Sequence, residues 1–379
     1  IRRPPRSTPS NSSAASDVYK RQIPICWEKR SVNEVSKIKL AVIMSALNEE
    51  RTIGDVIDGI PRKMGVPAQV LVIVVDDGST DRTGYIAREK GAVVIRHERR
   101  LGLGRSFTEG LDRALQEGAD VVVNIDADGQ FNPQDIPALI APILQGRADL
   151  VTASRFANKE LTPRMSWIKK WGNRAMSRLV NFVTGVTALT DVSCGFRAYS
   201  LEAALQIRLS GHFTHVQETI IDLVNKGMRV VEVPLRIKGA REHGDSRVAK
   251  SIPRYALRAG GIVMRTLCRS RPLFFFGLIG GTVLGLGVMQ GLIAAAYWCL
   301  KGEAMPVWSL LFSSSLFITT GFLTLVLALV ADMVKRVIEV SERVLFLAKF
   351  NEYRARKQDR ARTAAQPRSS AGALSDHAE

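Results

Sequence analysis

The sequence predicts an α/β domain built on a mainly parallel sheet, followed by a membrane-attached part. Between residues 37 and 240, short β-branched runs alternate with helical stretches, which is typical of parallel strands covered by helices. Several of the predicted strands end in polar or charged residues, as a site at one edge of such a sheet requires. Further along the chain, two long runs contain no charged residue at all.

Five strands are predicted in the first part of the chain. The first covers residues 39–47, and the others are expected at 70–75, at 92–95, from 121 onward, and at 149–153. A helix is expected to follow the two glycines at 102 and 104 and to end near Gln116. Ser79 or Thr80 is expected to cap the helix that follows the second strand.

The fourth predicted strand ends in two aspartates one residue apart, Asp126 and Asp128, followed by Gly129. In open α/β sheets, ligands bind just beyond the carboxyl ends of the strands. Two carboxylates this close suit a hard divalent cation that also holds phosphate oxygens. Taken alone, Asp-x-Asp is more often a turn that follows a core strand, so the neighbouring strands must decide between the two readings.

Polar side chains also follow three other predicted strands. Asn48 and Glu49 close the first strand, Asp76 and Asp77 close the second, and Arg155 follows the fifth. These groups are expected to meet the two aspartates at one sheet edge, which favours a metal site over a chance turn. The guanidinium of Arg155 matches the geometry of a phosphate, and a surface ion pair is its alternative role.

Several other kinds of site are excluded. The glycines at 102 and 104 lack a third at dinucleotide-binding spacing, and there is no GxxxxGK[ST] or GxSxG motif. The four cysteines show no paired metal-ligand spacing, and the histidines form no HExxH motif. The net charge of +17 implies an acidic partner. Because no zinc finger or RNA-binding aromatic signature occurs, this partner is expected to be anionic lipid and not nucleic acid.

A transmembrane hairpin is predicted in the second part of the chain. Residues 273–300 and 306–331 are uncharged and long enough to span a bilayer, and only five residues join them. Close packing of the two helices is expected at Gly280, Gly281, Gly285 and Gly287. By the positive-inside rule, both ends of the hairpin are cytoplasmic, because they carry Arg265, Arg269, Arg271, Lys335 and Arg336.

Five segments are therefore predicted. Residues 1–36 are expected to be disordered or foreign to the natural protein, and residues 37–240 to form a cytoplasmic domain. Residues 241–272 carry basic residues at helical spacing and are expected to form interfacial amphipathic helices. The hairpin occupies 273–333, and 334–379 form a cytoplasmic helix, from about 337 to 353, and a disordered basic tail.

Five motifs in order carry a resemblance to a known family. They are Asn48-Glu49, the stretch 74–83 around Asp76-Asp77-Gly78, Asp126-Ala127-Asp128-Gly129-Gln130, Asp191-Val192-Ser193-Cys194-Gly195-Phe196-Arg197, and Val231-Glu232-Val233-Pro234 with Arg241, Gly244, Ser246 and Arg247. Together they resemble the inverting family-two glycosyltransferases. Within that family they are most similar to the dolichyl-phosphate mannose synthase group and its bacterial polyprenyl-phosphate relatives. Ser45 and Leu47 depart from the usual Pro and Tyr, which leaves the nucleotide base open.

The resemblance implies a nucleotide-sugar-binding fold of the GT-A type and a role for each motif. The residues implied to bind the nucleotide sugar, GDP- or UDP-linked, are Asn48, Glu49, Asp76, Asp77 and Asp126. Mg²⁺ or Mn²⁺ is expected on Asp126, Asp128 and Gln130, and an acceptor phosphate on Arg155, Lys169 and Arg247. Asp128 and Arg155 are the expected catalytic residues.

The expected function is metal-dependent, inverting transfer of a sugar to a polyprenyl phosphate, dolichyl or undecaprenyl, at the cytoplasmic membrane face. A lipid phosphate is already anionic at neutral pH, so it needs positioning cations and no general base. The alternatives are a membrane glycosyltransferase with a lipid or glycan hydroxyl acceptor, a catalytically silent membrane recruitment protein, and a soluble sugar nucleotidyltransferase. The donor sugar and the oligomeric state stay open, and a homo-oligomer is compatible with the sequence.

Overall fold

The structure is a computed structural model of the chain. It describes residues 38–66, 68–163, 165, 167–186, 189–208, 216–238, 261, 272–301 and 305–365. The predicted N-terminal segment 1–36 and the end of the predicted tail lie outside these residues. Almost all of the predicted interfacial segment 241–272 lies outside them as well.

A seven-stranded sheet forms the centre of the first domain. Its strands, in the spatial order β3-β2-β1-β4-β6-β5-β7, are β1 (Ile38–Ala46), β2 (Ala68–Asp76), β3 (Val93–Arg96), β4 (Val121–Asn124), β5 (Leu150–Ser154), β6 (Arg197–Ser200) and β7 (Val230–Pro234). Only β6 runs antiparallel to its neighbours, so the mainly parallel α/β fold is confirmed.

Helices cover both faces of the sheet. This is required because the apolar side chains of β1 point alternately to one face and the other. Leu40, Val42 and Met44 join one core with α2 (Ile53–Asp58), α3 (Thr83–Glu89) and α5 (Ile136–Leu144). Ala41 and Ile43 point to the other core, which is covered by α4 (Leu103–Gln116), α6 (Trp167–Thr184), α7 (Leu201–Gln206) and α8 (Val216–Asn225). Two short 3₁₀ helices, Pro133–Asp135 and Lys159–Leu161, complete the connections.

Two local expectations are corrected by the structure. Strand β6 was not expected, because Arg197–Ser200 is short, polar at both ends and lacks a β-branched run. Neither Ser79 nor Thr80 caps α3, since the Ser79 hydroxyl accepts a hydrogen bond from the backbone N–H of Asn48. The first N–H of α3 is bound instead by Asp81, whose Oδ1 lies 3.0 Å from the nitrogen of Thr83.

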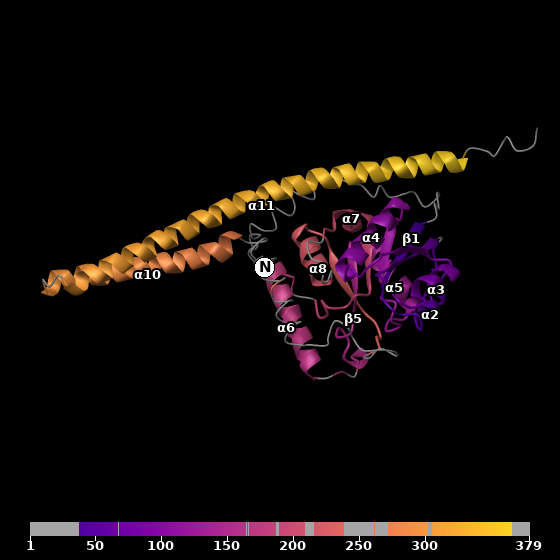
Figure 1. Cartoon of the computed structure of the whole chain (residues 1–379), viewed down its shortest axis with the longest axis horizontal. Helices are drawn as coiled ribbons and strands as arrows, with labels where there is room; N and C mark the ends of the chain where they lie inside the picture. Colours follow the sequence, from indigo (N-terminus) through magenta and orange to yellow (C-terminus); the bar gives the residue numbers. More distant parts are fainter. Residues whose placement is uncertain are drawn as a thin grey trace, which may run out of the picture.

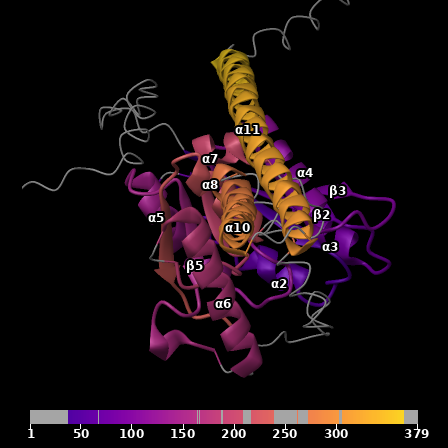
Figure 2. The same ribbon diagram turned by 90° about the vertical axis from the view of Figure 1, so that its left-hand side faces the viewer.

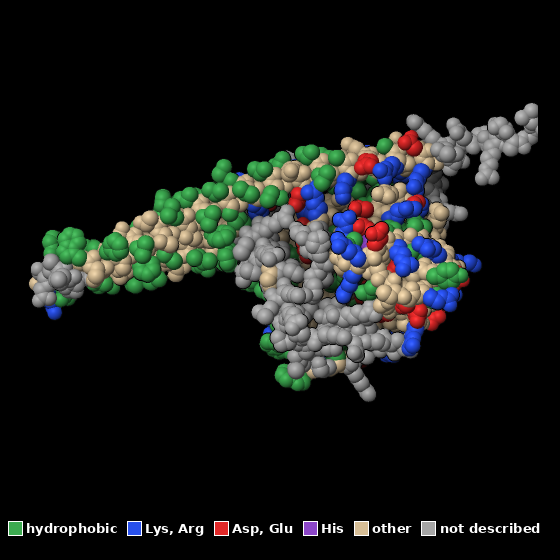
Figure 3. Space-filling view, viewed as in Figure 1, with side chains coloured by type: hydrophobic (Ala, Val, Ile, Leu, Met, Phe, Trp, Pro, Cys, Tyr) green, Lys and Arg blue, Asp and Glu red, His purple; other side chains and the backbone are tan. Residues whose placement is uncertain are grey.

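Two long helices, α10 (Pro272–Lys301) and α11 (Met305–Ala365), form a hairpin that projects from one side of the domain (Figure 1). Both are long and apolar enough to cross a membrane, and only 17% and 11% of their most apolar windows are buried. Hydrophobic side chains cover the hairpin, whereas Lys, Arg, Asp and Glu gather on the domain (Figure 3). A core helix of a soluble domain would be mostly buried, so the predicted membrane attachment is supported.

The hairpin differs from the sequence expectation in two respects. Gly280 and Gly287 lie against α11, where an added Cβ would come within 3.0 Å and 2.8 Å of backbone atoms. Gly281 and Gly285 instead have no atom within 4 Å of such a Cβ, so they do not serve helix packing. The predicted helix 337–353 is not separate, because α11 continues unbroken from the second span. Residues 331–365 contain no Gly or Pro that could end it.

Candidate active site

Hydrogen bonds join the loop after β1 to the loop after β2 at the carboxyl edge of the sheet. The backbone N–H of Asn48 donates to Ser79 Oγ at 2.9 Å, and Asn48 Oδ1 accepts from the N–H of Thr80 at 2.8 Å. The N–H of Glu49 donates to Thr83 Oγ1 at 2.8 Å. Asn48 holds a left-handed backbone with φ of 50°, which Asn tolerates better than most residues. The predicted Asn48-Glu49 and Asp76-Asp77 motifs are therefore brought together.

Asp76 is fully buried at the end of β2. Its Oδ1 accepts the N–H of Ser79 at 2.9 Å, and within the described part of the chain its Oδ2 accepts no hydrogen bond. The Arg96 Nε lies 3.7 Å from Oδ2. A Cβ on Gly84 would come within 2.6 Å of the same oxygen, so the glycine leaves room for this carboxylate.

Asp77 holds the segment that leads into α4. Its carboxylate accepts the N–H groups of Leu101 and Gly102 at 2.7 and 2.9 Å. It also contacts His97 Nδ1 at 2.8 Å, and His97 Nε2 lies 2.9 Å from Glu109 of α4. Burial alone would lower the pKa of His97, but the hydrogen bonds to Asp77 and Glu109 outweigh it and the pKa is raised. No local sequence pattern predicted this role for His97.

The two aspartates after β4 lie on a turn that is held by hydrogen bonds. Asp128 is 3% exposed, and its Oδ1 accepts the N–H of Gln130 at 3.1 Å. Gly129 has a φ of 71°, a conformation that favours glycine, and the carbonyl of Ala127 accepts from Thr52 Oγ1 at 2.7 Å. The hydrogen bonds of Gln130 in this turn are made by its backbone, so the predicted role of its side chain stays a prediction.

Asp126 is approached by the loop before β6. A Cβ on Gly195 would lie 3.1 Å from Asp126 Oδ2, so only a glycine lets this loop come so close without crowding. The side chain of Asn124 fixes the approach by donating to the carbonyl of Gly195 at 2.7 Å. The third and fourth motifs are therefore in contact, although Asn124 and Gly195 are 71 residues apart in the sequence.

The two aspartates fit a hard divalent cation. Mg²⁺ is commonly held by one or two carboxylates together with substrate phosphates, and Mn²⁺ favours the same oxygen ligands. No group of three or more His, Cys, Asp or Glu side chains that could hold a metal occurs among the described residues. A cation on Asp126 and Asp128 would therefore depend on phosphate oxygens of a ligand, as at many nucleotide sites.

Arg155 pairs with a buried carboxylate. Its Nε and Nη2 donate to Asp191 Oδ2 and Oδ1 at 2.6 and 2.9 Å, in a bidentate arrangement. Asp191 is fully buried, whereas the Arg155 side chain is 23% exposed. The structure thus shows an ion pair of Arg155, but its partner is buried, so it is not the surface ion pair considered as the alternative. Its role toward a phosphate stays a prediction.

Glu232 of β7 supports the same loop. Its Oε1 accepts the N–H groups of Thr190 and Asp191 at 2.7 and 2.8 Å, and its Oε2 contacts Thr190 Oγ1 at 2.6 Å. The fourth and fifth motifs are therefore joined through Asp191 and Glu232, for which the sequence supplied only the motif resemblance. Arg247 lies outside the described residues. Lys169 lies on α6, with its side chain outside them.

Helix α6, between Arg155 and Asp191 in the sequence, carries exposed aromatic side chains. Trp167, Phe182 and Trp171 are 75%, 70% and 67% exposed. The helix lies on the side of the domain nearest the hairpin and runs across the hairpin direction (Figures 1 and 2). This surface was not predicted from the sequence, because an interfacial helix was expected only after residue 240.

Residues 41–208 match the sequence profile of glycosyl transferase family 2. Over 216 residues the chain is 32% identical to UDP-N-acetylglucosamine–dolichyl-phosphate N-acetylglucosaminyltransferase of Methanococcus voltae, covering 52% of this chain and 84% of that protein. The chain belongs to glycosyl transferase family 2. It is also 33% identical over 199 residues to polyprenol monophosphomannose synthase of Mycolicibacterium smegmatis, covering 50% of this chain and 74% of that protein.

The resemblance to the polyprenyl-phosphate group of family 2 is thereby confirmed, and the protein is a glycosyltransferase. Among solved structures, glucosyl-3-phosphoglycerate synthase from Mycobacterium tuberculosis, in complex with Mn²⁺, uridine diphosphate and glucosyl-3-phosphoglycerate, is similar. Its TM-score is 0.48 at 26% identity, and the match covers 62% of this chain and 80% of that one.

Proposed function

We propose that this glycosyltransferase moves a sugar from a nucleotide sugar to a polyprenyl phosphate, with metal dependence and inversion, at the cytoplasmic membrane face. The observation that carries the proposal is the pair of relatives at 32% and 33% identity. Their names give different sugars, N-acetylglucosamine and mannose, but both name a polyprenyl-type phosphate. The acceptor class is the common property, so it is proposed here. The sugar, and whether the donor carries GDP or UDP, is left to experiment.

The donor would lie along the edge formed by the loops after β1, β2 and β4. Asn48, Glu49, Asp76 and Asp77 would contact its nucleoside, while Asp126 would lie near the diphosphate. Asp126 and Asp128, with Gln130, would hold Mg²⁺ or Mn²⁺. When bound, such a cation supplies Lewis-acid neutralisation of the charge that develops on the leaving diphosphate.

The acceptor phosphate would approach from the side of Arg155. It is already a nucleophile at neutral pH, so the chain must hold the phosphate and offset its repulsion from the donor diphosphate. Arg155 is oriented by Asp191, whose backbone N–H donates to Glu232, and is the first candidate for this role. Lys169 and Arg247 are proposed as further candidates. Attack opposite the leaving group would invert the anomeric centre.

The membrane side of the proposal is supported by two surfaces. The α10–α11 hairpin carries hydrophobic side chains on its surface (Figure 3). Helix α6 lies on the side of the domain nearest the hairpin (Figure 1) and exposes Trp167, Trp171 and Phe182. Tryptophan is enriched where membrane meets water, so α6 would lie on the bilayer surface. A lipid phosphate in the headgroup layer would then be close to Arg155, which precedes this helix.

The division of the chain follows from this placement. Residues 37–240 would form the cytoplasmic catalytic domain and 241–272 the interfacial helices. Residues 273–333 would form the transmembrane hairpin, and 334–379 the cytoplasmic extension and tail. Lys335 and Arg336, directly after the second span, support the cytoplasmic side by the positive-inside rule.

The test uses purified protein with radiolabelled GDP-mannose, UDP-glucose or UDP-N-acetylglucosamine, and with Mg²⁺ or Mn²⁺. Each donor is offered polyprenyl phosphate, polyprenol or diacylglycerol in separate vesicles. We expect one donor to label polyprenyl phosphate alone. Labelling of a hydroxyl lipid, with none on polyprenyl phosphate, would establish the alternative acceptor class and refute the proposal.

A further inference from the structure

The second half of α11 leaves the hairpin and lies along the catalytic domain, where it contacts α4 and α7 (Figures 1 and 2). We call residues 342–360 the brace. Its contacts recur every three or four residues, so they fall on one face of the helix. Along that face lie Glu342, Phe346, Lys349, Tyr353, Lys357 and Arg360.

The brace binds the C-terminal end of α4. Tyr353 Oη lies 3.2 and 3.3 Å from the carbonyl oxygens of Ala119 and Gly118, and this tyrosine is only 6% exposed. Arg360 Nη1 donates to the carbonyl of Glu117 at 2.6 Å. The last carbonyls of a helix and the turn that follows lack partners within the helix and carry partial negative charge. A hydroxyl and a guanidinium therefore stabilise them.

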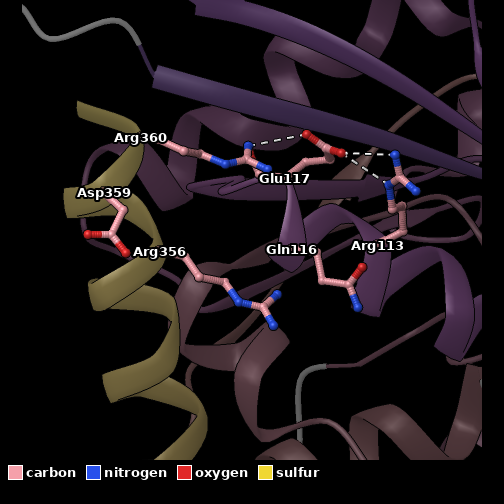
Figure 4. A pocket seen from close by; sticks show the side chains of 6 residues that line it. All are labelled: Arg113, Gln116, Glu117, Arg356, Asp359 and Arg360. Carbon is pink, nitrogen blue, oxygen red and sulfur yellow. Dashed lines mark hydrogen bonds and ion pairs between the residues drawn. The ribbon is translucent and has the colours of Figure 1, made fainter. Parts of the chain in front are cut away.

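Ion pairs add to these hydrogen bonds. Lys357 pairs with Asp120, and Lys349 Nζ lies 3.9 Å from Asp112 Oδ1. Glu117 joins the two helices, because one carboxylate oxygen accepts from Arg113 of α4 and the other from Arg360 of the brace (Figure 4). Burial would raise the pKa of Glu117, but the neighbouring guanidinium groups outweigh it and the pKa is lowered.

The brace continues without a break from the segment predicted to be the second membrane span. No Gly or Pro interrupts α11 between residues 331 and 365. The distance along the helix from the end of the predicted span to Tyr353 is about 33 Å, at about 1.5 Å per residue. A domain that is joined to a membrane hairpin at only one point can turn about that point. A rigid helix bound to α4 adds a second attachment, and two attachments fix an orientation.

We propose that the brace sets the orientation of the catalytic domain over the bilayer, so that the Asp126–Asp128 edge meets a lipid-borne acceptor. Tyr353, Lys357 and Arg360 are then positioning residues. This inference rests on the proposed function, because it requires an acceptor that is held in the membrane. The brace contacts the end of α4 that is remote from Gly102 and Asp77. Its loss should therefore spare donor binding and transfer to an acceptor that is free in solution.

The test compares Lys357→Glu with the matched control Arg354→Glu, which makes the same charge change on the same helix. Arg354 is exposed, and its guanidinium lies 5.2 Å from the ring centre of Phe350, a residue of α11 itself. Two acceptors are used: a long-chain polyprenyl phosphate in vesicles and a short, water-soluble isoprenyl phosphate. For Lys357→Glu we expect kcat/KM to fall about tenfold with the long acceptor and to stay within about twofold with the short one. The donor KM should not change.

Two further variants sharpen the test. Asp120→Lys, added to Lys357→Glu, restores an opposite-charge pair and should recover most of the lost rate, which a general folding defect would not allow. Tyr353→Phe removes only the hydroxyl and should give a smaller loss, about threefold. Hydrogen–deuterium exchange of residues 117–120 should rise in Lys357→Glu and not in Arg354→Glu.

Failure of the proposed function and failure of the orientation role of the brace would give different results. If the wild-type protein labels neither phosphate, the proposed function is wrong and the orientation role falls with it. If the wild-type protein labels both, and Lys357→Glu loses neither activity or loses both equally, the brace does not orient the domain and only this inference is overturned.

Discussion

The donor side and the proposed acceptor side of the site are built in different ways. On the donor side, short loops after β1, β2 and β4 are held by backbone N–H groups and by neighbouring side chains, as at Asn48 and Asp77. On the acceptor side, Arg155, Asp191 and Glu232 come from three distant segments, and α6 exposes aromatic rings. The proposed donor side is thus held by hydrogen bonds within the domain, whereas the proposed acceptor side exposes aromatic rings that would face a membrane.

The largest effect is expected on the donor side, at Asp128. Asp128→Asn keeps the shape of the buried side chain and an oxygen for the N–H of Gln130, but it removes the charge that a metal needs. Transfer should fall about a thousandfold or more, with an unchanged unfolding transition. Asp58→Asn, an exposed aspartate paired with Lys90, is the control. Retained activity in Asp128→Asn would remove this residue from the metal site.

The next prediction tests whether Arg155 acts on the acceptor or only forms an ion pair with Asp191. Arg155→Lys loses the bidentate contact with buried Asp191, and we expect the acceptor KM to rise about tenfold and the free energy of unfolding to fall by about 1–2 kcal/mol. Arg229→Lys is the matched control, because Arg229 holds Asp149 in the same bidentate way at the opposite end of β5. If both variants change the acceptor KM equally, Arg155 has no special role toward the acceptor.

A similar effect on transfer is expected where the two sides meet, at Gly195. Gly195→Ala would place a Cβ 3.1 Å from Asp126 Oδ2 and push this carboxylate away by a few tenths of an ångström. Transfer should fall about tenfold. Gly172→Ala on α6 has open space around its Cβ and should leave the rate unchanged. Steady-state rates at saturating metal provide the comparison, and equal rates for both variants would show that Asp126 tolerates displacement.

The smallest effect concerns pH and His97. Because Asp77 and Glu109 raise the pKa of His97 in the folded protein, its charge contributes stability that is fully present below the ordinary pKa of about 6.5. This contribution is lost as the pH rises through the raised pKa. The stability difference between the wild-type protein and His97→Gln, measured by urea unfolding, should therefore shrink as the pH rises above about 6.5. A difference that grows over this range would contradict the assignment.

The difference between local loops and contacts of distant segments also explains which features could be predicted from the sequence. Parallel strands and their polar ends are local patterns, so the loops with Asp76, Asp126 and Asp128 were identified from the residues. Strand β6 and the Asp191–Glu232 contact depend on pairing between distant segments, which no local pattern records. The brace was missed because the cytoplasmic helix was expected to be separate from the second span. The docking of Tyr353 onto residues 118 and 119 is a tertiary contact of the same kind.

The central claim is that a sugar is transferred with inversion to a lipid phosphate. The most direct measurement is mass spectrometry and NMR of the lipid product formed by the purified protein from an α-linked nucleotide sugar. We predict one sugar residue joined to polyprenyl phosphate through its anomeric carbon, in the β configuration and absent in Asp128→Asn. A product with retained configuration, or a sugar on a lipid hydroxyl, would contradict the claim.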